Sequence, residues 1–186
     1  MTDIKWINAE EISDESFNRL VADFSCPIDE DIEHFIKDTT DDIRSGATAM
    51  RKLAKTRIYL AFIDGNVVGY YATAVKVFDL SSASNALRKE WTGFSNNKTV
   101  PAYLIGQLSK NYFNDFDKLI AGKTLLNSAL DTIRACHKAV GCKIVFLECQ
   151  DTPKLHNFYK EHGFVRFGNK SSKGLYTYFH DLSSNI

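Results

Sequence analysis

Residues Lys143 to Gly168 read KIVFLECQDTPKLHNFYKEHGFVRFG, and the fold of the chain is decided here. The apolar run KIVFLEC predicts a buried strand, and FVRFG predicts a second strand after a short helix. Thr152 is a candidate N-cap for that helix, and Pro153 suits its first position, where no backbone donor is needed. Gly163 can end the helix in a left-handed conformation. The stretch therefore predicts a strand, a helix and a strand in succession.

The predicted helix has one apolar face, and a tyrosine lies on it. The 3.6-residue period places Leu155, Phe158, Tyr159 and His162 on the same side. The pattern alone leaves two interpretations of Tyr159 open, because an aromatic residue on such a face is either a packed core side chain or a reactive one.

The composition is that of one ordinary globular domain. The chain has 186 residues, of which 44% are hydrophobic and 25% are charged, and we expect a single domain over residues 1–186. The 23 basic side chains balance the 23 acidic ones, so nothing favours non-specific nucleic-acid binding by the chain as a whole. A nucleic-acid partner is therefore not expected from composition.

The amino-terminal sequence and the thiol pattern indicate a cytoplasmic protein. The start, MTDIKWINAEE, lacks the charged and apolar regions of a signal peptide, and no apolar stretch approaches the roughly 20 residues of a membrane span. The four cysteines show no CxxC spacing, so we expect Cys136 and Cys149 to be buried, reduced thiols, and a catalytic cysteine is the weaker alternative. The five histidines show no HxxxH or HExxH spacing, so no metal site is expected.

The first part of the chain predicts a strand, two helices and a hairpin. IKWI is the strand, one helix opens near Ser13, and a second helix has acids in its first turn, where they complement the helix dipole. We expect that second helix to bury Ile28, Ile32, Phe35, Ile36 and Ile43 and to expose Asp38, Asp41 and Asp42. The run RIYLAFIDGNVVGYYATAVKVFDL then predicts a β-hairpin, because Asp64-Gly65 is a strong tight-turn signal.

The middle of the chain predicts a central strand and a long helix. A polar segment from Ser81 to Thr99 contains a short predicted helix around Ala86 to Trp91. VPAYLIGQLSKN is the central strand, and Gly141 closes the long helix that follows YFNDFDK. A helix that crosses between two strands makes them parallel neighbours. The element order therefore predicts an α/β protein with a mixed sheet and helices on both faces, in which the last strand, LYTYFHDL, is an edge that can pair in a homodimer.

One segment has the composition of a phosphate-binding loop. The long helix begins with AGKTLL, where free backbone N–H groups and the positive end of the dipole suit a pyrophosphate. The small residues Ala121 and Gly122 allow close approach, the Thr124 hydroxyl is near, and Lys118 and Lys123 add charge. A glycine near a helix start is also typical of ordinary capping, so the pattern alone leaves both interpretations open.

Taken together, VPAYLIGQLSKN, AGKTLLNSAL and KIVFLECQDTPKLHNFYKEHGFVRFG resemble the core of the GNAT superfamily, the acetyl-CoA-dependent N-acetyltransferases. The resemblance covers roughly Ile58 to Gly168, and its strongest match is LHNFYKEHGF to the F-Y-x-x-x-G-F segment of that family. The strand after the polar insertion is similar to the branch that includes tRNA-acetylating toxins. The resemblance implies a mostly antiparallel sheet of six to seven strands with a central parallel pair that splays apart.

The resemblance also implies where acetyl-CoA binds. The pantetheine arm inserts between the splayed strands and pairs with the backbone of Leu108, Ser109 and Lys110. The pyrophosphate contacts the amides of the helix start, and these belong to Ile120, Ala121, Gly122, Lys123 and Thr124. The sequence departs from the usual Q/R-x-x-G-x-G/A loop, because Asp117 and Ile120 stand where Gln or Arg and the first glycine belong.

Acetyl transfer to an amine needs a base, an oxyanion donor and an acid for the leaving thiolate. The resemblance points the hydroxyl of Tyr159 toward the cofactor sulfur, which makes it the candidate acid, and the Leu108 amide is the candidate oxyanion donor. Glu148 ends a central strand and is the candidate base, since burial would raise its pKa. The alternatives are a core aromatic at Tyr159 and a hydrogen-bonded structural carboxylate at Glu148.

Three functional hypotheses follow. The first is an N-acetyltransferase that acts on an amine of a small molecule, peptide or protein, and the second is a non-catalytic domain that binds coenzyme A or a partner protein. The third is a toxin-type acetyltransferase of aminoacyl-tRNA. It ranks lower here because the chain is neutral, its second helix is acidic, and Gln107 stands where that branch commonly has arginine.

Overall fold

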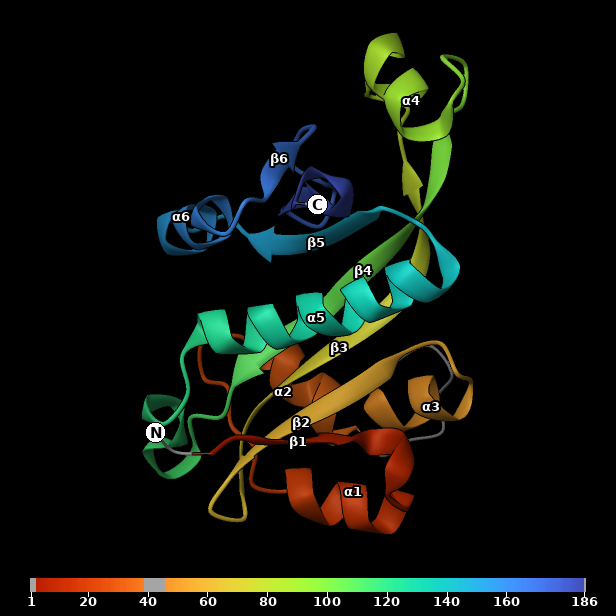
Figure 1. The fold of residues 1–186 in the computed structure, drawn as a ribbon. Coiled ribbons are helices and arrows are strands. Elements are labelled where there is room, and N and C mark those ends of the chain that lie inside the picture. The colour runs from red at the N-terminus through yellow and green to blue at the C-terminus, as the bar shows by residue number, and fades with distance from the viewer. Residues whose placement is uncertain (1–2, 39–45, 186) are drawn as a thin grey trace. The chain divides into compact units, whose positions relative to one another are not determined.

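The computed structural model describes residues 3–38 and 46–185. Helices and 3₁₀ segments alternate with seven strands along the chain (Figure 1). In chain order the elements are β1 Lys5–Asn8, η1 Ala9–Glu11, α1 Asp14–Val21, α2 Glu30–Lys37, α3 Ala47–Lys52, β2 Arg57–Ile63, β3 Asn66–Asp79, α4 Asn85–Thr92, β4 Thr99–Lys110, η2 Phe113–Lys118, α5 Gly122–Val140, β5 Ile144–Gln150, α6 Pro153–Glu161, β6 Val165–Phe167, β7 Leu175–Asp181 and η3 Leu182–Asn185. Among these described helices none is long and apolar enough to cross a membrane.

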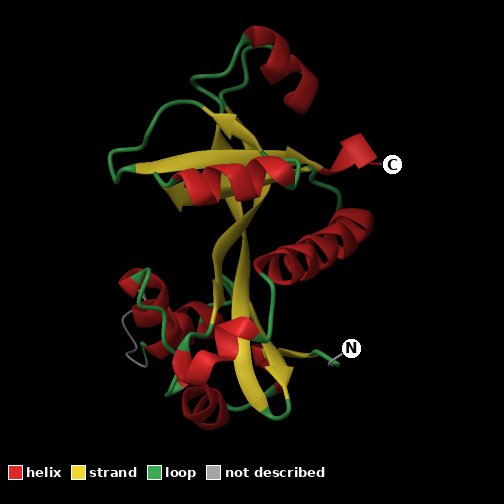
Figure 2. Ribbon diagram, turned by 90° about the vertical axis from the view of Figure 1, so that its left-hand side faces the viewer, coloured by secondary structure: helices red, strands yellow, loops and turns green. Residues whose placement is uncertain are grey.

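The strands form one mixed sheet in the order β1-β2-β3-β4-β5-β7-β6 (yellow in Figure 2). The central pair, β4 and β5, is parallel and brings Tyr103 opposite Val145 and Leu104 opposite Phe146. The pairs β1–β2, β2–β3, β5–β7 and β6–β7 are antiparallel. The α/β sheet with a central parallel pair is therefore confirmed. The splay of that pair beyond Leu104 stays a prediction.

The chain forms two compact units, each built from two stretches of sequence. Unit 1 consists of Met1–Ala74 and Ile105–Thr132, and unit 2 consists of Val75–Leu104 and Ile133–Ile186. Strands β3 and β4 and helix α5 each begin in one unit and end in the other. A single domain over residues 1–186 stays a prediction.

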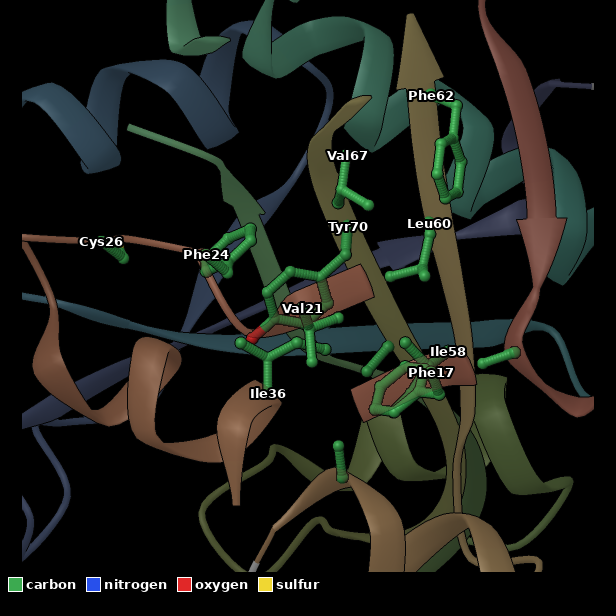
Figure 3. Close-up of a cluster of buried hydrophobic side chains, with 13 residues drawn as sticks. Phe17, Val21, Phe24, Cys26, Ile36, Ile58, Leu60, Phe62, Val67 and Tyr70 are labelled. Carbon is green, nitrogen blue, oxygen red and sulfur yellow. The ribbon is translucent and has the colours of Figure 1, made fainter. Parts of the chain in front are cut away.

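The core of unit 1 lies between the first helices and the β2–β3 hairpin. Phe17 and Val21 of α1 and Ile36 of α2 are buried together with Leu60 and Tyr70 of the two strands (Figure 3). The Tyr70 hydroxyl donates to the carbonyl oxygen of Ile32 at 3.0 Å. Apolar side chains on helical and strand periods thus meet as the sequence predicts.

Capping and turn residues in the sequence predict most of these elements correctly. Ser13 caps α1 by accepting from the Ser16 amide, and the hairpin turn has left-handed residues at Asp64 and Gly65. Helix α3 was not predicted, because it begins after Gly46 without a side-chain cap. Two expectations for the second helix are wrong: Ile28 is 66% exposed, because it precedes the N-cap Asp29 and lies outside α2, and Asp38, which follows the last residue of α2, is buried. The expected exposed Asp41 and Asp42 and the expected buried Ile43 lie outside the described residues.

The end of β4 is held in unit 1 by a buried asparagine. Asn111 is 3% exposed; its Nδ2 donates to the Val67 carbonyl at 2.8 Å, and its Oδ1 accepts from the Ser25 and Phe113 amides at 3.0 Å each. The backbone amide of Asn111 also donates to the Val68 carbonyl at 2.8 Å. One side chain thus ties the strand end to β3 and to the segment after α1.

A glycine allows β3 to approach that strand end closely. A Cβ atom added to Gly69 would lie 2.8 Å from the Ser109 carbonyl oxygen and 3.2 Å from the Leu125 methyl groups. Real Cβ atoms do not approach backbone this closely, so only glycine fits without a shift of β4. Gly69 and Asn111 together set the position of residues 108–110.

Unit 2 contains the strand–helix–strand stretch of residues 143–168. Thr152 caps α6 by accepting from the Leu155 amide, Pro153 is its first residue, and Gly163 is left-handed, as predicted. The expectation of an exposed edge at β7 is wrong, because β7 pairs with β5 on one side and β6 on the other. The edges of the sheet are β1 and β6, so a homodimer formed through β7 is not supported.

We predict that Asn111→Ala lowers the free energy of unfolding by about 1–3 kcal/mol, because it leaves buried backbone groups without partners. Urea unfolding followed by circular dichroism measures this change. The matched control is Asn127→Ala, at an exposed position of α5, which should change stability by less than about 0.5 kcal/mol. Equal stability of the two variants would contradict the proposed role of the buried amide.

Candidate active site

The segment of β4 predicted to pair with a cofactor is fixed by side chains of its own unit. Ser109 is 6% exposed, and its hydroxyl donates to the Lys110 carbonyl at 2.9 Å and lies 3.3 Å from the Cys26 sulfur. The Lys110 ammonium donates to the Asp117 carbonyl oxygen at 2.6 Å and lies 3.7 Å from the Asp117 carboxylate. These contacts hold the β4 end against the loop that precedes α5.

That ion pair involves the acid at which the loop departs from the family pattern. Asp117 stands where Gln or Arg is usual, and the nearby Lys110 compensates its negative charge. A phosphate group at the start of α5 would therefore not meet an unpaired carboxylate at position 117. The acid at position 117 is compatible with an anion site in the same unit.

The start of α5 has the properties of an anion site. The helix begins at Gly122 and has no acidic residue in its first turn, and Lys123 is exposed. The Thr124 amide donates to the Ala121 carbonyl at 3.0 Å, which leaves the amides before it outside the helical ladder. Before the helix, Asn114 and Asp115 adopt left-handed φ values of 48° and 60°. The residues fit a pyrophosphate, which the dipole end and Lys123 would favour.

Tyr159 combines a packed ring with an unengaged hydroxyl. It is 7% exposed, and its ring centroid lies 5.1 Å from that of Phe158, 5.9 Å from Phe164 and 6.0 Å from Tyr178. Among the described residues its hydroxyl has no hydrogen-bond partner. Burial, with a smaller contribution from Cys149, raises the pKa of Tyr159 and keeps the hydroxyl protonated. The two interpretations of this residue are therefore compatible, since the ring packs and the hydroxyl is free to donate.

Glu148 differs from expectation, because it is exposed rather than buried. Side chains alternate along β5, so Glu148 shares a face with Phe146, while Leu147 and Cys149 are buried on the other face. Tyr178 pairs with Leu147 across the strands and contacts Tyr159. The structure therefore places Glu148 and Tyr159 on opposite faces of β5 and does not bring their side chains together.

A chain of polar contacts beside Tyr159 was not predicted. His156 Nε2 lies 3.0 Å from Asp151 Oδ1, and the Tyr178 hydroxyl lies 2.9 Å from His156 Nδ1. The Lys170 ammonium donates to Asp151 Oδ2 at 3.0 Å. The His156 hydrogen bond, and then Lys170, hold the pKa of Asp151 below its usual range. These polar contacts join the start of α6 to β7. No sequence motif predicts them, because the residues come from separate parts of the sequence.

The thiols do not offer a second catalytic centre. Cys149 is buried, as expected, and burial raises its pKa to about 11, so the nucleophilic thiolate is disfavoured at neutral pH. The expectation for Cys136 is wrong, because this residue is exposed. Residues 3–38 and 46–185 contain no group of three or more His, Cys, Asp or Glu side chains that could hold a metal ion.

The chain resembles known proteins in structure and not in sequence. No family model and no curated protein matches it. A structure of AtaT complexed with acetyl-methionyl-tRNAfMet superimposes with a TM-score of 0.70 at 21% identity, over 98% of this chain and 96% of AtaT. A tyrosine-to-phenylalanine mutant of KacT gives a TM-score of 0.72 at 18% identity, over 99% and 97% of the two chains. AtaTR bound with AcCoA gives 0.66 at 19% identity, over 98% and 95%. AtaT is a toxin, and one of its structures is bound to the C-terminus of the antitoxin AtaR.

This chain has the GNAT fold. The superposition spans nearly the whole chain, so the fold implied by LHNFYKEHGF is confirmed well beyond Ile58 to Gly168. The parallel β4–β5 pair and the helix α6 after β5 agree with the sequence prediction.

Net neutrality conceals a separation of charge between the two units. Unit 2 carries twelve Lys and Arg against six Asp and Glu, a balance of +6, so unit 1 carries the remaining eleven against seventeen, a balance of −6. Nine of the twelve basic residues of unit 2 are exposed. The expectation that a nucleic-acid partner is unlikely rested on the net charge of the chain, and that charge does not describe unit 2.

We predict that the titration of Cys149 lowers the free energy of unfolding as the pH rises from 9 to 11. Its pKa is about 11 in the folded state against an ordinary 9.0, so its stabilisation is complete below pH 9.0 and is lost as the pH rises through 11. Urea midpoints measured across this range should fall less steeply for Cys149→Ala than for the unmodified protein. Cys136→Ala, at an exposed site, should keep the original slope. Identical slopes in all three proteins would refute the prediction.

Proposed function

We propose that the chain is an N-acetyltransferase that transfers the acetyl group of acetyl-CoA to an amine. The observation that carries the proposal is Tyr159, whose buried ring holds an unengaged hydroxyl at the position of the family's F-Y segment in a GNAT fold. The similarity to AtaTR bound with AcCoA supports acetyl-CoA as the donor. The residues of β4 and α5 described above are suited to hold it.

The proposed binding mode uses backbone more than side chains. The amides and carbonyls of Leu108, Ser109 and Lys110 would pair with the pantetheine arm, and the amides from Ile120 to Thr124 would bind the pyrophosphate. Acetyl-CoA supplies the activated thioester when bound. The Leu108 amide would donate to the thioester oxygen, on which negative charge develops.

The proposed proton transfers follow from the faces of β5. Glu148 would take a proton from the acceptor ammonium on one face, so that the neutral nitrogen forms the new C–N bond as the C–S bond breaks. Tyr159 would give its proton to the departing thiolate, and the second proton that the nitrogen loses on forming the amide would return to the phenolate through water. Because the nitrogen and the sulfur are bonded to the same carbon, Glu148 on the opposite face would take the first proton through a water relay. Glu148 is open to an incoming substrate, and the Tyr159 hydroxyl stays protonated until it is needed.

Among acceptors, we propose aminoacyl-tRNA ahead of a free small molecule, peptide or protein amine. The +6 balance of unit 2 supports a polyanionic partner, because Lys and Arg that neutralise phosphates supply most of the affinity for nucleic acid. The structurally similar AtaT is complexed with acetyl-methionyl-tRNAfMet, and other AtaT structures include an antitoxin and DNA. This order reverses the ranking from overall charge alone.

We predict that Tyr159→Phe lowers the rate of coenzyme A release with aminoacyl-tRNA by about 10²–10⁴-fold while acetyl-CoA binding is retained, because one proton donor is lost. Calorimetry measures binding, and a thiol reagent measures release. Tyr103→Phe is the matched control, since the Tyr103 hydroxyl donates to the Gly141 carbonyl. An unchanged rate in Tyr159→Phe would remove Tyr159 from the acid role. Binding without turnover in the unmodified protein would favour the non-catalytic alternative.

We predict that reversing exposed charges of unit 2 weakens tRNA binding and its salt dependence. The test is a triple variant that combines Lys154→Glu, Lys160→Glu and Lys173→Glu. The slope of log affinity against log salt should shrink by about 0.7–0.9 for each phosphate group that is no longer neutralised. The control, Lys5→Glu, Lys55→Glu, reverses two exposed charges of unit 1 and should leave the slope unchanged. Equal reductions of the slope in both variants would contradict a phosphate-binding role of unit 2.

A further inference from the structure

Helix α6, which carries Tyr159, is held near both ends by one strand. Near the start of the helix, His156 Nδ1 lies 2.9 Å from the Tyr178 hydroxyl of β7. Just after its end, the Gly163 carbonyl oxygen lies 2.9 Å from Nδ1 of His180, two residues further along β7. Tyr178 and His180 are both buried and lie on the same face of the strand, because side chains alternate along it. The segment that carries Tyr159 is therefore fixed to β7 at two points that flank this residue.

The contact at the start of α6 continues to the end of β5. Asp151 follows β5 directly; its Oδ1 lies 3.0 Å from His156 Nε2, and its Oδ2 accepts from the Lys170 ammonium at 3.0 Å. An ionised carboxylate can only accept, so the proton of a neutral His156 is on Nε2. Nδ1 is then the acceptor, and the buried Tyr178 hydroxyl donates to it. His156 is thus oriented by two hydrogen bonds that use both of its ring nitrogens.

Aromatic contacts connect these two attachment points to Tyr159. The Tyr178 ring centroid lies 5.9 Å from that of His156 and 6.0 Å from that of Tyr159. His156 precedes Tyr159 by three residues, so the two side chains are neighbours on the surface of α6. The Phe164 ring centroid lies 5.9 Å from that of Tyr159 and 5.3 Å from that of His180. The position of the Tyr159 ring therefore depends on how β7 holds α6.

We propose that His156 and Tyr178 are positioning residues for acetyl transfer, which set where the Tyr159 hydroxyl stands relative to the cofactor sulfur. The proposal rests on the proposed function, because Tyr159 is the acid of that reaction. A general acid must lie within hydrogen-bond reach of the atom that it protonates, and a displacement of about 1 Å can lower a rate about 10²-fold. The hydrogen bond between His156 and Tyr178 opposes such a displacement, because α6 cannot slide along β7 without breaking it.

The first test follows the Tyr159 ring by NMR in protein with isotope-labelled tyrosine rings, and it needs no acetyl-CoA. Tyr178→Phe removes one hydroxyl, and His156→Phe keeps a ring but removes both of the hydrogen bonds that His156 makes. Both variants should shift the Tyr159 ring signals in the same direction, because both break the same contact. Signals are assigned by their loss in Tyr159→Phe. Shifts in opposite directions, or no shift in either variant, would overturn the proposal.

Tyr176→Phe is the matched control for this test. Tyr176 lies on the same face of β7, and its ring centroid is 5.2 Å from that of His156. Its hydroxyl does not bond to His156, because both ring nitrogens have other partners. The variant should therefore leave the Tyr159 signals in place, and a shift equal to that of Tyr178→Phe would count against the proposal. If Tyr178→Phe does not fold, His156→Phe decides, since the His156 side chain is 17% exposed and tolerates replacement better.

The second test separates positioning from a merely structural role by the rate of coenzyme A release. We expect Tyr178→Phe to lower kcat about 10- to 100-fold with an unchanged KM for acetyl-CoA. In a Tyr159→Phe background the same change should lower the rate by less than about threefold, because no proton donor is left to position. Losses that multiply in the double variant would overturn the proposal. If the NMR shifts occur as expected and the unmodified protein releases no coenzyme A, the proposed acetyl transfer fails while the positioning of Tyr159 by β7 stands.

Discussion

The buried amide of Asn111 is the contact on which the rest of the proposed cofactor site depends. It joins the end of β4 to β3 through Val67 and to the segment after α1 through Ser25. A strand end normally frays because its last backbone groups lack partners, and here a buried side chain supplies them. Gly69 allows β3 to lie close to the Ser109 carbonyl. The backbone of residues 108–110 is therefore held in one position. A cofactor that pairs with this backbone requires such a fixed position.

In unit 2 the governing constraint is the alternation of side chains along β5. Leu147 and Cys149 face the packed side, where the Tyr159 ring is held by Phe158, Phe164 and Tyr178. Phe146 and Glu148 lie on the opposite face. The strand thus separates an apolar environment, which keeps a phenol protonated, from an open environment that admits a charged amine.

Much of the fold could be predicted from local patterns, because caps, turns and periodicity are read from neighbouring residues. Thr152, Pro153 and Gly163 delimit α6, and Asp64-Gly65 closes the hairpin. Helix α3 was missed because Gly46 supplies no capping side chain. The exposure of Glu148 and Cys136 was missed because burial depends on which elements pack above a residue, and a single sequence does not state that. The interior position of β7 was missed for the same reason.

The charge of each unit cannot be predicted from the sequence before the fold is known. Each unit is assembled from two stretches of the chain, so a sum over the whole chain cancels +6 against −6. The contact chain from Asp151 through His156 to Tyr178 was hidden in the same way, since it crosses from the end of β5 to α6 and β7. Features that need three-dimensional proximity became visible only with the fold, and they changed the preferred acceptor.

The most direct test of the proposed cofactor site is the mapping of acetyl-CoA onto backbone amides by NMR of the isotope-labelled full chain. We expect saturable shifts of the amides of residues 108–110 and 122–124, with little change at the buried Ile36 and Leu60 of the unit 1 core. Saturable shifts confined to other parts of the chain, or no shifts at millimolar acetyl-CoA, would contradict the site.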